Sequence, residues 1–303
     1  MSRTWGLRPL ERTRDMAEVT ALWHAALGAV WPPSPGDLDL LRDGWVAVDP
    51  DGRLIGLVAI DSAGSVPLIL VAPERRRQGV GSALIASAVE QLTMDGVREI
   101  HAGSGGADYI WPGVPENLPD AAAFFTAREW SSHHTTIDLV QDLRDYRTPP
   151  GVAERAAGAG ARVRVAGAAA RDEVLALEAE HFPNWLKRFR KSFEFGTQEV
   201  LIARDADHRL VGSLLFSGPK ADAPYAALLG PEAGEIGCVG VIPDARDRGV
   251  GTAMVAMASR ILRQRGTRRC HIGWTRREEF YSRLGYRRWR GYHMFRRTIT
   301  TEG

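Results

Sequence analysis

The sequence contains few cysteines and no residue pattern that suggests a metal. Its 303 residues include only 2 cysteines, Cys238 and Cys270, which excludes a disulfide framework. Both stand among apolar residues, so we expect them to be buried small hydrophobic side chains. The histidines have no acidic or cysteine partners at ligand spacing, and no metal site is expected.

The sequence also lacks the features of membrane and nucleic-acid-binding proteins. No apolar run reaches the roughly eighteen residues of a membrane helix, and the first residues contain no apolar signal core. A net charge of +2 does not favour binding to nucleic acid. We therefore expect a cytoplasmic protein with neither a membrane nor a nucleic acid as partner.

What the chain does contain is an internal repeat. Residues 71–84 correspond to residues 241–254 at an offset of 170, with Val-x-Pro, an arginine and Gly-Val-Gly in both. A second offset, of 156, relates residues 53–56 to 209–212 and residues 124–125 to 280–281. At 44% hydrophobic and 25% charged residues the chain is globular, and its length fits two domains.

The two offsets differ by fourteen residues (170 − 156 = 14), so each copy carries one insertion of that length. It lies within 107–120 in the first copy and within 217–234 in the second. The two copies are joined by a stretch rich in proline, glycine and alanine, which is typical of a linker. We place the boundary near Pro149 and expect an N-terminal domain at 1–148 and a C-terminal domain at 149–303.

Each copy has the pattern of a mixed α/β domain. Segments with apolar residues at helical spacing alternate with short strand-like segments and turn signals. The expected helices are 13–27, 79–92, 170–180 and 249–263, and the expected strands are 45–48, 53–60, 66–71, 200–203, 209–216 and 236–241. This order predicts α/β folds of the α+β type, each with a mixed, mostly antiparallel central sheet flanked by helices.

In each copy a strand runs into a glycine loop and then into a helix. Gly79 and Gly81, with their counterparts Gly249 and Gly251, remove side chains so that backbone amides can approach an anion at the helix start. Neither a dinucleotide fingerprint nor a Walker loop is present. A glycine-containing helix start without a ligand is the alternative, but its occurrence in both copies with flanking arginines favours a pyrophosphate site.

Both copies resemble the GCN5-related N-acetyltransferase (GNAT) superfamily. Its signature, Arg/Gln-x-x-Gly-x-Gly/Ala, stands at residues 76–81 and 246–251, and its later aromatic motif stands at residues 280–286. The resemblance covers residues 4–140 and 162–299, and it implies tandem GNAT domains with acetyl-CoA, or a related acyl-CoA, as the donor. The pantetheine arm would pair with the strand before the loop, and the pyrophosphate would lie on the loop backbone.

The cosubstrate-binding residues that this resemblance implies fall in both copies. In the second copy they are Val239, Gly240, Val241, Arg246, Arg248, Gly249, Val250, Gly251 and Thr252. In the first copy they are Leu70, Val71, Arg76, Arg77, Gly79, Val80, Gly81 and Ser82.

The resemblance also indicates which copy is catalytic. Transfer from a thioester to an amine needs a proton acceptor for the ammonium, a donor to the oxyanion and a proton donor to the thiolate. Glu235 stands where the histone-acetyltransferase branch has its general-base glutamate. Tyr281 stands where many members have the tyrosine that protonates the coenzyme A sulfur. The first copy has Ser65 and Phe125 there, so we expect it to be degenerate.

The residues around the acceptor are less clearly marked. His181 and Trp185 lie where the first two helices of the family meet, which is a usual wall of the acceptor pocket. Trp274 and the second insertion, 221–233 with Tyr225, are further candidates, and core packing is an equal alternative for these aromatic residues. In the first copy, the aromatic loop 109–115 either closes over its own domain or docks on the other.

We therefore expect an acetyl-CoA-dependent N-acetyltransferase that acts on the primary amine of a small molecule, as a monomer or a homodimer. The C-terminal domain would catalyse a direct ternary-complex transfer, with a backbone amide near Val239 as the oxyanion donor. Two alternatives stay open: catalysis in the N-terminal domain through a water relay, and an acyl-CoA-binding sensor without turnover.

Overall fold

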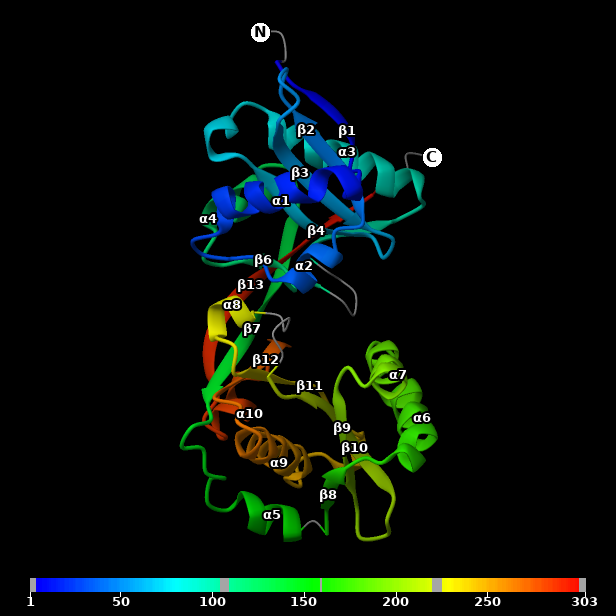
Figure 1. Ribbon diagram of the computed structural model, residues 1–303. Coiled ribbons are helices and arrows are strands. Elements are labelled where there is room, and N and C mark those ends of the chain that lie inside the picture. The colour runs from blue at the N-terminus through cyan, green and yellow to red at the C-terminus, as the bar shows by residue number, and fades with distance from the viewer. Residues whose placement is uncertain (1–3, 104–108, 159, 220–224, 300–303) are drawn as a thin grey trace. The chain divides into compact units, whose positions relative to one another are not determined.

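The computed structural model describes residues 4–103, 109–158, 160–219 and 225–299 (Figure 1). Its contacts divide the chain into two compact units. Unit 1 contains Met1–Thr136 and Gly291–Gly303, and unit 2 contains Ile137–Arg290. No helix in the described part of the chain is both long and apolar enough to cross a membrane.

The elements of the two units follow the same order, except that β6 occurs only in unit 1 and that α5 and α8 occur only in unit 2. Unit 1 contains β1 (Gly6–Pro9), α1 (Arg12–Leu27), α2 (Pro35–Asp39), β2 (Asp43–Val48), β3 (Leu54–Asp61), β4 (Ser65–Val71), α3 (Val80–Met94), β5 (Glu99–Ala102), β6 (Val114–Pro115) and α4 (Pro119–Thr126). Unit 2 contains α5 (Val152–Gly158), β8 (Arg162–Val165), α6 (Arg171–His181), α7 (Leu186–Phe195), β9 (Glu199–Arg204), β10 (Leu210–Ser217), α8 (Ala226–Leu229), β11 (Ala233–Val241), α9 (Val250–Gln264), β12 (Arg269–Thr275) and α10 (Glu278–Ser282). Two longer strands, β7 (Ser131–Asp142) and β13 (Arg287–Thr298), belong to both units.

Each unit contains a mixed sheet that is completed by a strand from the other repeat. The strand order is β1-β2-β3-β4-β5-β13 in unit 1 and β7-β12-β11-β10-β9-β8 in unit 2. The end of β13, Arg296–Thr298, pairs antiparallel with β5, and the end of β7, up to Asp142, pairs antiparallel with β12. Each of the two long strands therefore begins in one unit and ends in the other.

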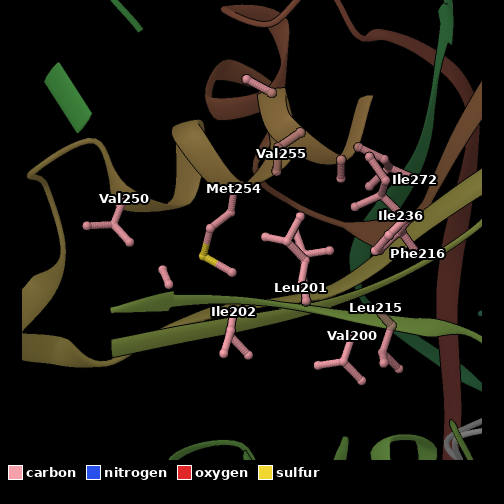
Figure 2. Packing of buried hydrophobic residues seen from close by; sticks show 14 of the residues in the cluster. Val200, Leu201, Ile202, Leu215, Phe216, Ile236, Val250, Met254, Val255 and Ile272 are labelled. Atoms are coloured by element: carbon pink, nitrogen blue, oxygen red, sulfur yellow. The ribbon is translucent and has the colours of Figure 1, made fainter. Parts of the chain in front are cut away.

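The core of unit 2 follows from the alternation of side chains along its strands. Figure 2 shows Val200 and Leu215 on one face of the sheet and Leu201 on the other, where Met254 and Val255 of α9 pack. Helices α6 and α7 pack on β10 and β9. Because adjacent residues of a strand point to opposite faces, both faces of this sheet are apolar and both are covered by helices.

The expected fold class is confirmed, and each expected helix and strand corresponds to an observed one within a few residues. The domain division differs from the expected boundary at 148/149, because the repeats exchange their last strands. The expected linker also contains a short helix, α5, which packs on α9 in unit 2. Its first residue, Val152, is buried and anchors it.

The aromatic loop of the first insertion packs within its own unit. The Trp111 ring lies 5.9 Å from that of Trp23 and 5.3 Å from that of Trp31. Strand β6 pairs with Tyr292 and His293 of β13, which are also unit 1 residues. Of the two expected placements, the structure thus shows closure over its own unit; residues 107 and 108 of this insertion lie outside the described residues.

The strand exchange predicts which unit a substitution in β7 will destabilise. Leu139 belongs to the first repeat in sequence but lies fully buried in the core of unit 2. Leu139→Ala should lower the free energy of unfolding of unit 2 by about 2–4 kcal/mol. In hydrogen-exchange mass spectrometry, amides of α9 should exchange faster while those of α3 keep their rates.

Leu84→Ala is the matched control, because Leu84 lies on α3 and is also fully buried. It should produce the reverse pattern. If Leu139→Ala instead increased the rate of hydrogen exchange in α3 and not in α9, the result would contradict the exchange of strands between the repeats.

Candidate active site

The two glycine loops share one backbone conformation. Asp247 and Gly249 have φ angles of 62° and 86°, and their counterparts Arg77 and Gly79 have φ angles of 62° and 83°. Left-handed residues within such a turn direct successive amides toward one concavity, which suits an anion. Helices α9 and α3 begin directly afterwards and add the positive end of the helix dipole. Each loop therefore has the geometry to hold a pyrophosphate on backbone amides.

The charge of the signature arginines suggests a phosphate ligand, but each of them binds a backbone carbonyl of the preceding strand. The Arg246 Nε donates to the carbonyl of Val241 at 3.0 Å, and the Arg76 Nε donates to the carbonyl of Val71 at 3.3 Å. Each guanidinium thus closes its loop onto the end of the preceding strand. These hydrogen bonds of Arg246 and Arg76 stabilise the conformation of the two glycine loops.

The inner glycines of the two loops serve packing. A Cβ on Gly251 would lie 3.3 Å from the ring of Phe280, and one on Gly81 would lie 3.1 Å from the ring of Phe124. These glycines admit an aromatic ring from α10 or α4 against the first turn of the helix. The other residues expected to bind the cosubstrate lie at the strand ends, in the loops or in the first turn of the helices. Val239, Gly240 and Val241 end β11, Leu70 and Val71 end β4, Arg248 and Arg77 are in the loops, and Val250, Thr252, Val80 and Ser82 open α9 and α3.

Among the described residues, the edge of β11 that faces β12 has no strand partner beyond Glu235. Parallel pairing between β11 and β12 runs only over Ala233–Glu235 among the described residues. The pairing with β10 shifts register between Gly237 and Gly240, and Cys238 has a φ of 50°. Such a bulge re-aims the backbone. The amides from Gly237 onward on the β12 side are therefore available to an extended arm and to an oxyanion.

Glu235 lies at the point where the two strands separate. Its side chain is half-buried, and its Oε1 accepts hydrogen bonds from Gln198 Nε2 at 2.7 Å and from Ser217 Oγ at 3.2 Å. Both donors bind the same oxygen, so the carboxylate is oriented, and Oε2 accepts no hydrogen bond from the described residues. In the parallel register, Glu235 stands opposite His271 of β12.

Tyr281, on α10, is kept protonated by its surroundings. It is 7% exposed. Burial raises the pKa of its hydroxyl well above the usual value, and the charge of the Cys238 thiolate would raise it further. Burial also raises the pKa of the Cys238 thiol to about 12. Both groups therefore stay neutral at physiological pH, and the tyrosine can donate a proton beside the bulge.

The corresponding positions of the first copy have structural partners. The Ser65 hydroxyl is fully buried and donates to Asp61 Oδ2 at 2.6 Å. Phe125 packs between the rings of Trp130 and Phe295, at 5.1 and 5.8 Å. Neither side chain offers a proton acceptor or donor to a ligand.

The expected acceptor residues are only partly brought together. The Trp185 ring stacks on that of Phe182 at 5.1 Å, and Phe182 covers Gly240, where a Cβ would lie 2.7 Å from its ring. His181 instead lies beside Glu180, with Nε2 3.6 Å from a carboxylate oxygen. Sequence reasoning did not select Phe182, although its ring, at the end of α6, contacts Gly240 of β11.

The described part of the second insertion contributes Tyr225, which packs beside His271 of β12. Tyr225 packs edge-on against His271, with ring centroids 4.9 Å apart. Residues 221–224, the start of the expected acceptor insertion, lie outside the described residues. The backbone amide of Trp274 donates to Asp138 Oδ1 at 2.8 Å, so Trp274 is tied to β7.

These two units can be compared with known proteins. The profile of the acetyltransferase (GNAT) family matches the chain twice, at residues 16–106 and 170–292. The chain therefore belongs to the GNAT acetyltransferase family, with two domains of that fold in tandem.

Among the curated relatives, a mycothiol acetyltransferase of Cellulomonas flavigena is 29% identical over 74% of this chain and 64% of its own length. A mycothiol acetyltransferase of Clavibacter sepedonicus is 31% identical over 72% of this chain and 66% of its own length. The chain thus spans slightly less than two thirds of these relatives.

Among solved structures, the chain is similar to a GCN5-related glucosamine N-acetyltransferase region of a fungal multi-domain GH3 β-N-acetylglucosaminidase. The TM-score is 0.90 at 28% identity, over 98% of this chain and 38% of that one. A tandem GNAT protein from the clavulanic acid biosynthesis pathway has the same fold, with a TM-score of 0.68 at 19% identity, over 99% of this chain and 100% of that one.

A buried carboxyl beside the site should make stability depend on pH. Glu178 of α6 is fully buried, burial raises its pKa to about 8, and the hydroxyl of Ser213 donates to it. The folded state therefore binds this proton more tightly than the unfolded state, whose glutamate titrates near 4.5. The stabilisation is complete below pH 4.5 and is lost as the pH rises to about 8.

Glu178→Gln, which is neutral throughout, should remove this slope. Since one pKa unit corresponds to about 1.4 kcal/mol, the variant should gain on the order of 4 kcal/mol relative to the wild type between pH 5 and 9. Urea unfolding at a series of pH values measures this difference. Parallel pH profiles for the two proteins would contradict the assignment.

Proposed function

We propose that the chain transfers the acetyl group of acetyl-CoA to the primary amine of a small molecule, and that unit 2 carries the reaction. One observation carries this proposal. Glu235 and Tyr281 both lie beside the bulge in β11, next to a backbone edge without a strand partner among the described residues. The equivalent positions of unit 1 are occupied by a serine and a phenylalanine with structural roles.

In the proposed reaction the pyrophosphate binds the backbone of Arg248–Thr252, and the pantetheine arm lies along Val239–Val241. Glu235 takes a proton from the acceptor ammonium, and the neutral amine then attacks the thioester carbonyl. A backbone amide near Val239 donates to the oxyanion. As the carbon–sulfur bond breaks, the nitrogen loses its remaining excess proton and the thiolate takes the proton of Tyr281, which solvent restores, so that one proton is released per turnover.

The surroundings of Cys238 support direct transfer without an acyl-enzyme. The thiolate is the nucleophilic form of cysteine, and a pKa of about 12 leaves almost none of it at neutral pH. Among the described residues, no base accepts a hydrogen bond from this thiol. A ternary complex of amine and acetyl-CoA is therefore the simpler route.

An amino sugar is the acceptor class that the comparisons favour. The glucosamine N-acetyltransferase region is 28% identical and superimposes over nearly the whole chain. Glucosamine supplies the primary amine that the proposed chemistry requires. We therefore propose glucosamine or a glucosamine-containing small molecule as the acceptor.

The tyrosine assignment predicts a selective loss of turnover. Tyr281→Phe removes the proton donor but keeps the buried ring, so kcat should fall about 100-fold while the Kd of acetyl-CoA changes less than twofold. Thiol release with glucosamine measures kcat, and calorimetry measures the Kd.

Tyr286→Phe is the matched control. Its hydroxyl is buried and lies 2.8 Å from Ser259 Oγ of α9. This variant should lose stability and keep its kcat. Unchanged kcat in Tyr281→Phe would remove Tyr281 from the mechanism.

A second pair of substitutions tests which loop holds the cosubstrate of the reaction. Gly79 and Gly249 have φ angles of 83° and 86°, so any other residue at either position is strained to a similar degree. Glutamate adds the same strain and the same charge at both, so only the bound anion distinguishes them. Gly249→Glu should abolish acetylation of glucosamine, whereas Gly79→Glu should retain it. The opposite result would move catalysis to unit 1.

A further inference from the structure

In the proposed reaction the acceptor nitrogen loses two protons, and Glu235 accepts only one of them. An ammonium becomes an amide by losing two protons, one before attack and one as the tetrahedral adduct collapses. Glu235 accepts the first of these in the proposed function, on which this inference rests. A second acceptor beside the nitrogen would prevent the amine from leaving again in place of the thiolate.

His271 lies where such an acceptor is needed. It stands opposite Glu235 in the last register position of the β11–β12 ladder, so the two side chains share one face of the sheet. It is 7% exposed, and its Nε2 lies 3.2 Å from Asp138 Oδ2. Since Nε2 faces this carboxylate, Nδ1 is the nitrogen that remains for a proton from a ligand.

Asp138 is built to hold the histidine. It is fully buried on β7, and its second oxygen accepts the backbone amide of Trp274 at 2.8 Å. A carboxylate anchored in this way lies beside the ring nitrogen and stabilises the imidazolium that forms. Among the described residues Nε2 makes no hydrogen bond of regular geometry, so its contact with Asp138 is a close approach of a buried nitrogen to a carboxylate oxygen.

Aromatic rings surround the pair and limit the access of water. The rings of Tyr225 and Trp289 lie 4.9 and 5.8 Å from that of His271, and 5.6 Å from each other. The guanidinium of Arg290 lies 5.0 Å from the Trp289 ring. In such a partly dry site, the attraction between an imidazolium and a carboxylate is stronger than in water.

The first copy provides an internal comparison. It keeps the histidine as His101, but the residue equivalent to Asp138 on its exchanged strand is Met294 (294 − 138 = 156). The register agrees, because His101 pairs with Arg296 as His271 pairs with Val140. Instead His101 lies 3.3 Å from Glu99, and both side chains are about one third exposed. The buried acid thus occurs only in the copy that carries Glu235 and Tyr281.

We propose that His271, held by Asp138, is a second proton acceptor of the acceptor site. Glu235 takes the ammonium proton, and the amine forms the bond to the carbonyl carbon. As the carbon–sulfur bond breaks, the remaining excess proton on nitrogen passes to Nδ1 of His271, and the thiolate takes the proton of Tyr281. Solvent restores Tyr281 and removes the protons from Glu235 and His271, so one proton is released per turnover.

The test uses the full chain, acetyl-CoA and glucosamine, or the best amine of a primary-amine panel if glucosamine is not acetylated. His271→Gln should lower kcat about 100-fold and leave the Kd of acetyl-CoA within twofold. Asp138→Asn should lower kcat about 10-fold, and the double variant should be no slower than His271→Gln, because the two residues act as a unit. Imidazole in solution should restore part of the activity of His271→Ala.

His101→Gln is the matched control and should keep the wild-type kcat. A kcat within threefold of the wild type for His271→Gln, or additive losses in the double variant, would overturn the proposal while leaving the proposed function intact. If His271→Gln does not fold, a wild-type kcat in Asp138→Asn overturns it equally. If the wild type acetylates no amine, the proposed function itself fails, and this inference fails with it.

Discussion

The rest of the structure depends on the exchange of the last strand between the two repeats. The β12 edge of unit 2 is paired by the end of β7, and the β5 edge of unit 1 is paired by the end of β13. An unpaired strand edge exposes amides and carbonyls that bind other chains. In this structure neither repeat therefore completes its sheet with its own last strand. Because strand residues alternate, β7 also supplies Leu139 to the core and Asp138 to the opposite face, beside His271.

The two copies show how one backbone is used with and without reactive side chains. Their loops share the positive φ angles at Arg77 and Gly79, and at Asp247 and Gly249. The differences lie in single side chains, such as the serine whose hydroxyl is held by Asp61 in unit 1. The backbone features that bind an anion can thus persist after the groups that move protons have been replaced. Loop conformation alone does not identify a catalytic copy.

The sequence predicted what depends on local pattern. Strand and helix positions followed from the period of apolar residues, and the repeat aligned the two glycine loops, since these signals involve neighbouring residues. The strand exchange could not be predicted, because the local pattern of a strand does not show which of two similar sheets it joins. For the same reason nothing linked Asp138 to His271, which are 133 positions apart (271 − 138 = 133).

Other contacts of the site were also beyond local pattern. Phe182 covers Gly240 only because α6 ends above β11, which depends on how the helix packs. The inward hydrogen bond of Arg246 to Val241 depends on the turn geometry, whereas its charge alone suggested a phosphate ligand. Side chains at a domain surface have such tertiary partners, which the spacing of a motif does not reveal.

The charges around β11 are segregated along the strand in a way that suits the proposed reaction. Toward its C-terminal end, burial keeps the hydroxyl of Tyr281 and the thiol of Cys238 neutral, and it raises the pKa of Glu178 to about 8. A fixed anion there would oppose the negative charge that develops on oxygen and sulfur. The ionisable acceptors, Glu235 and the pair of His271 with Asp138, lie at the other end, where the ammonium must be attracted and deprotonated. The titratable side chains around β11 differ in burial and in partners. Proton donors can therefore lie at one end of the strand and proton acceptors at the other.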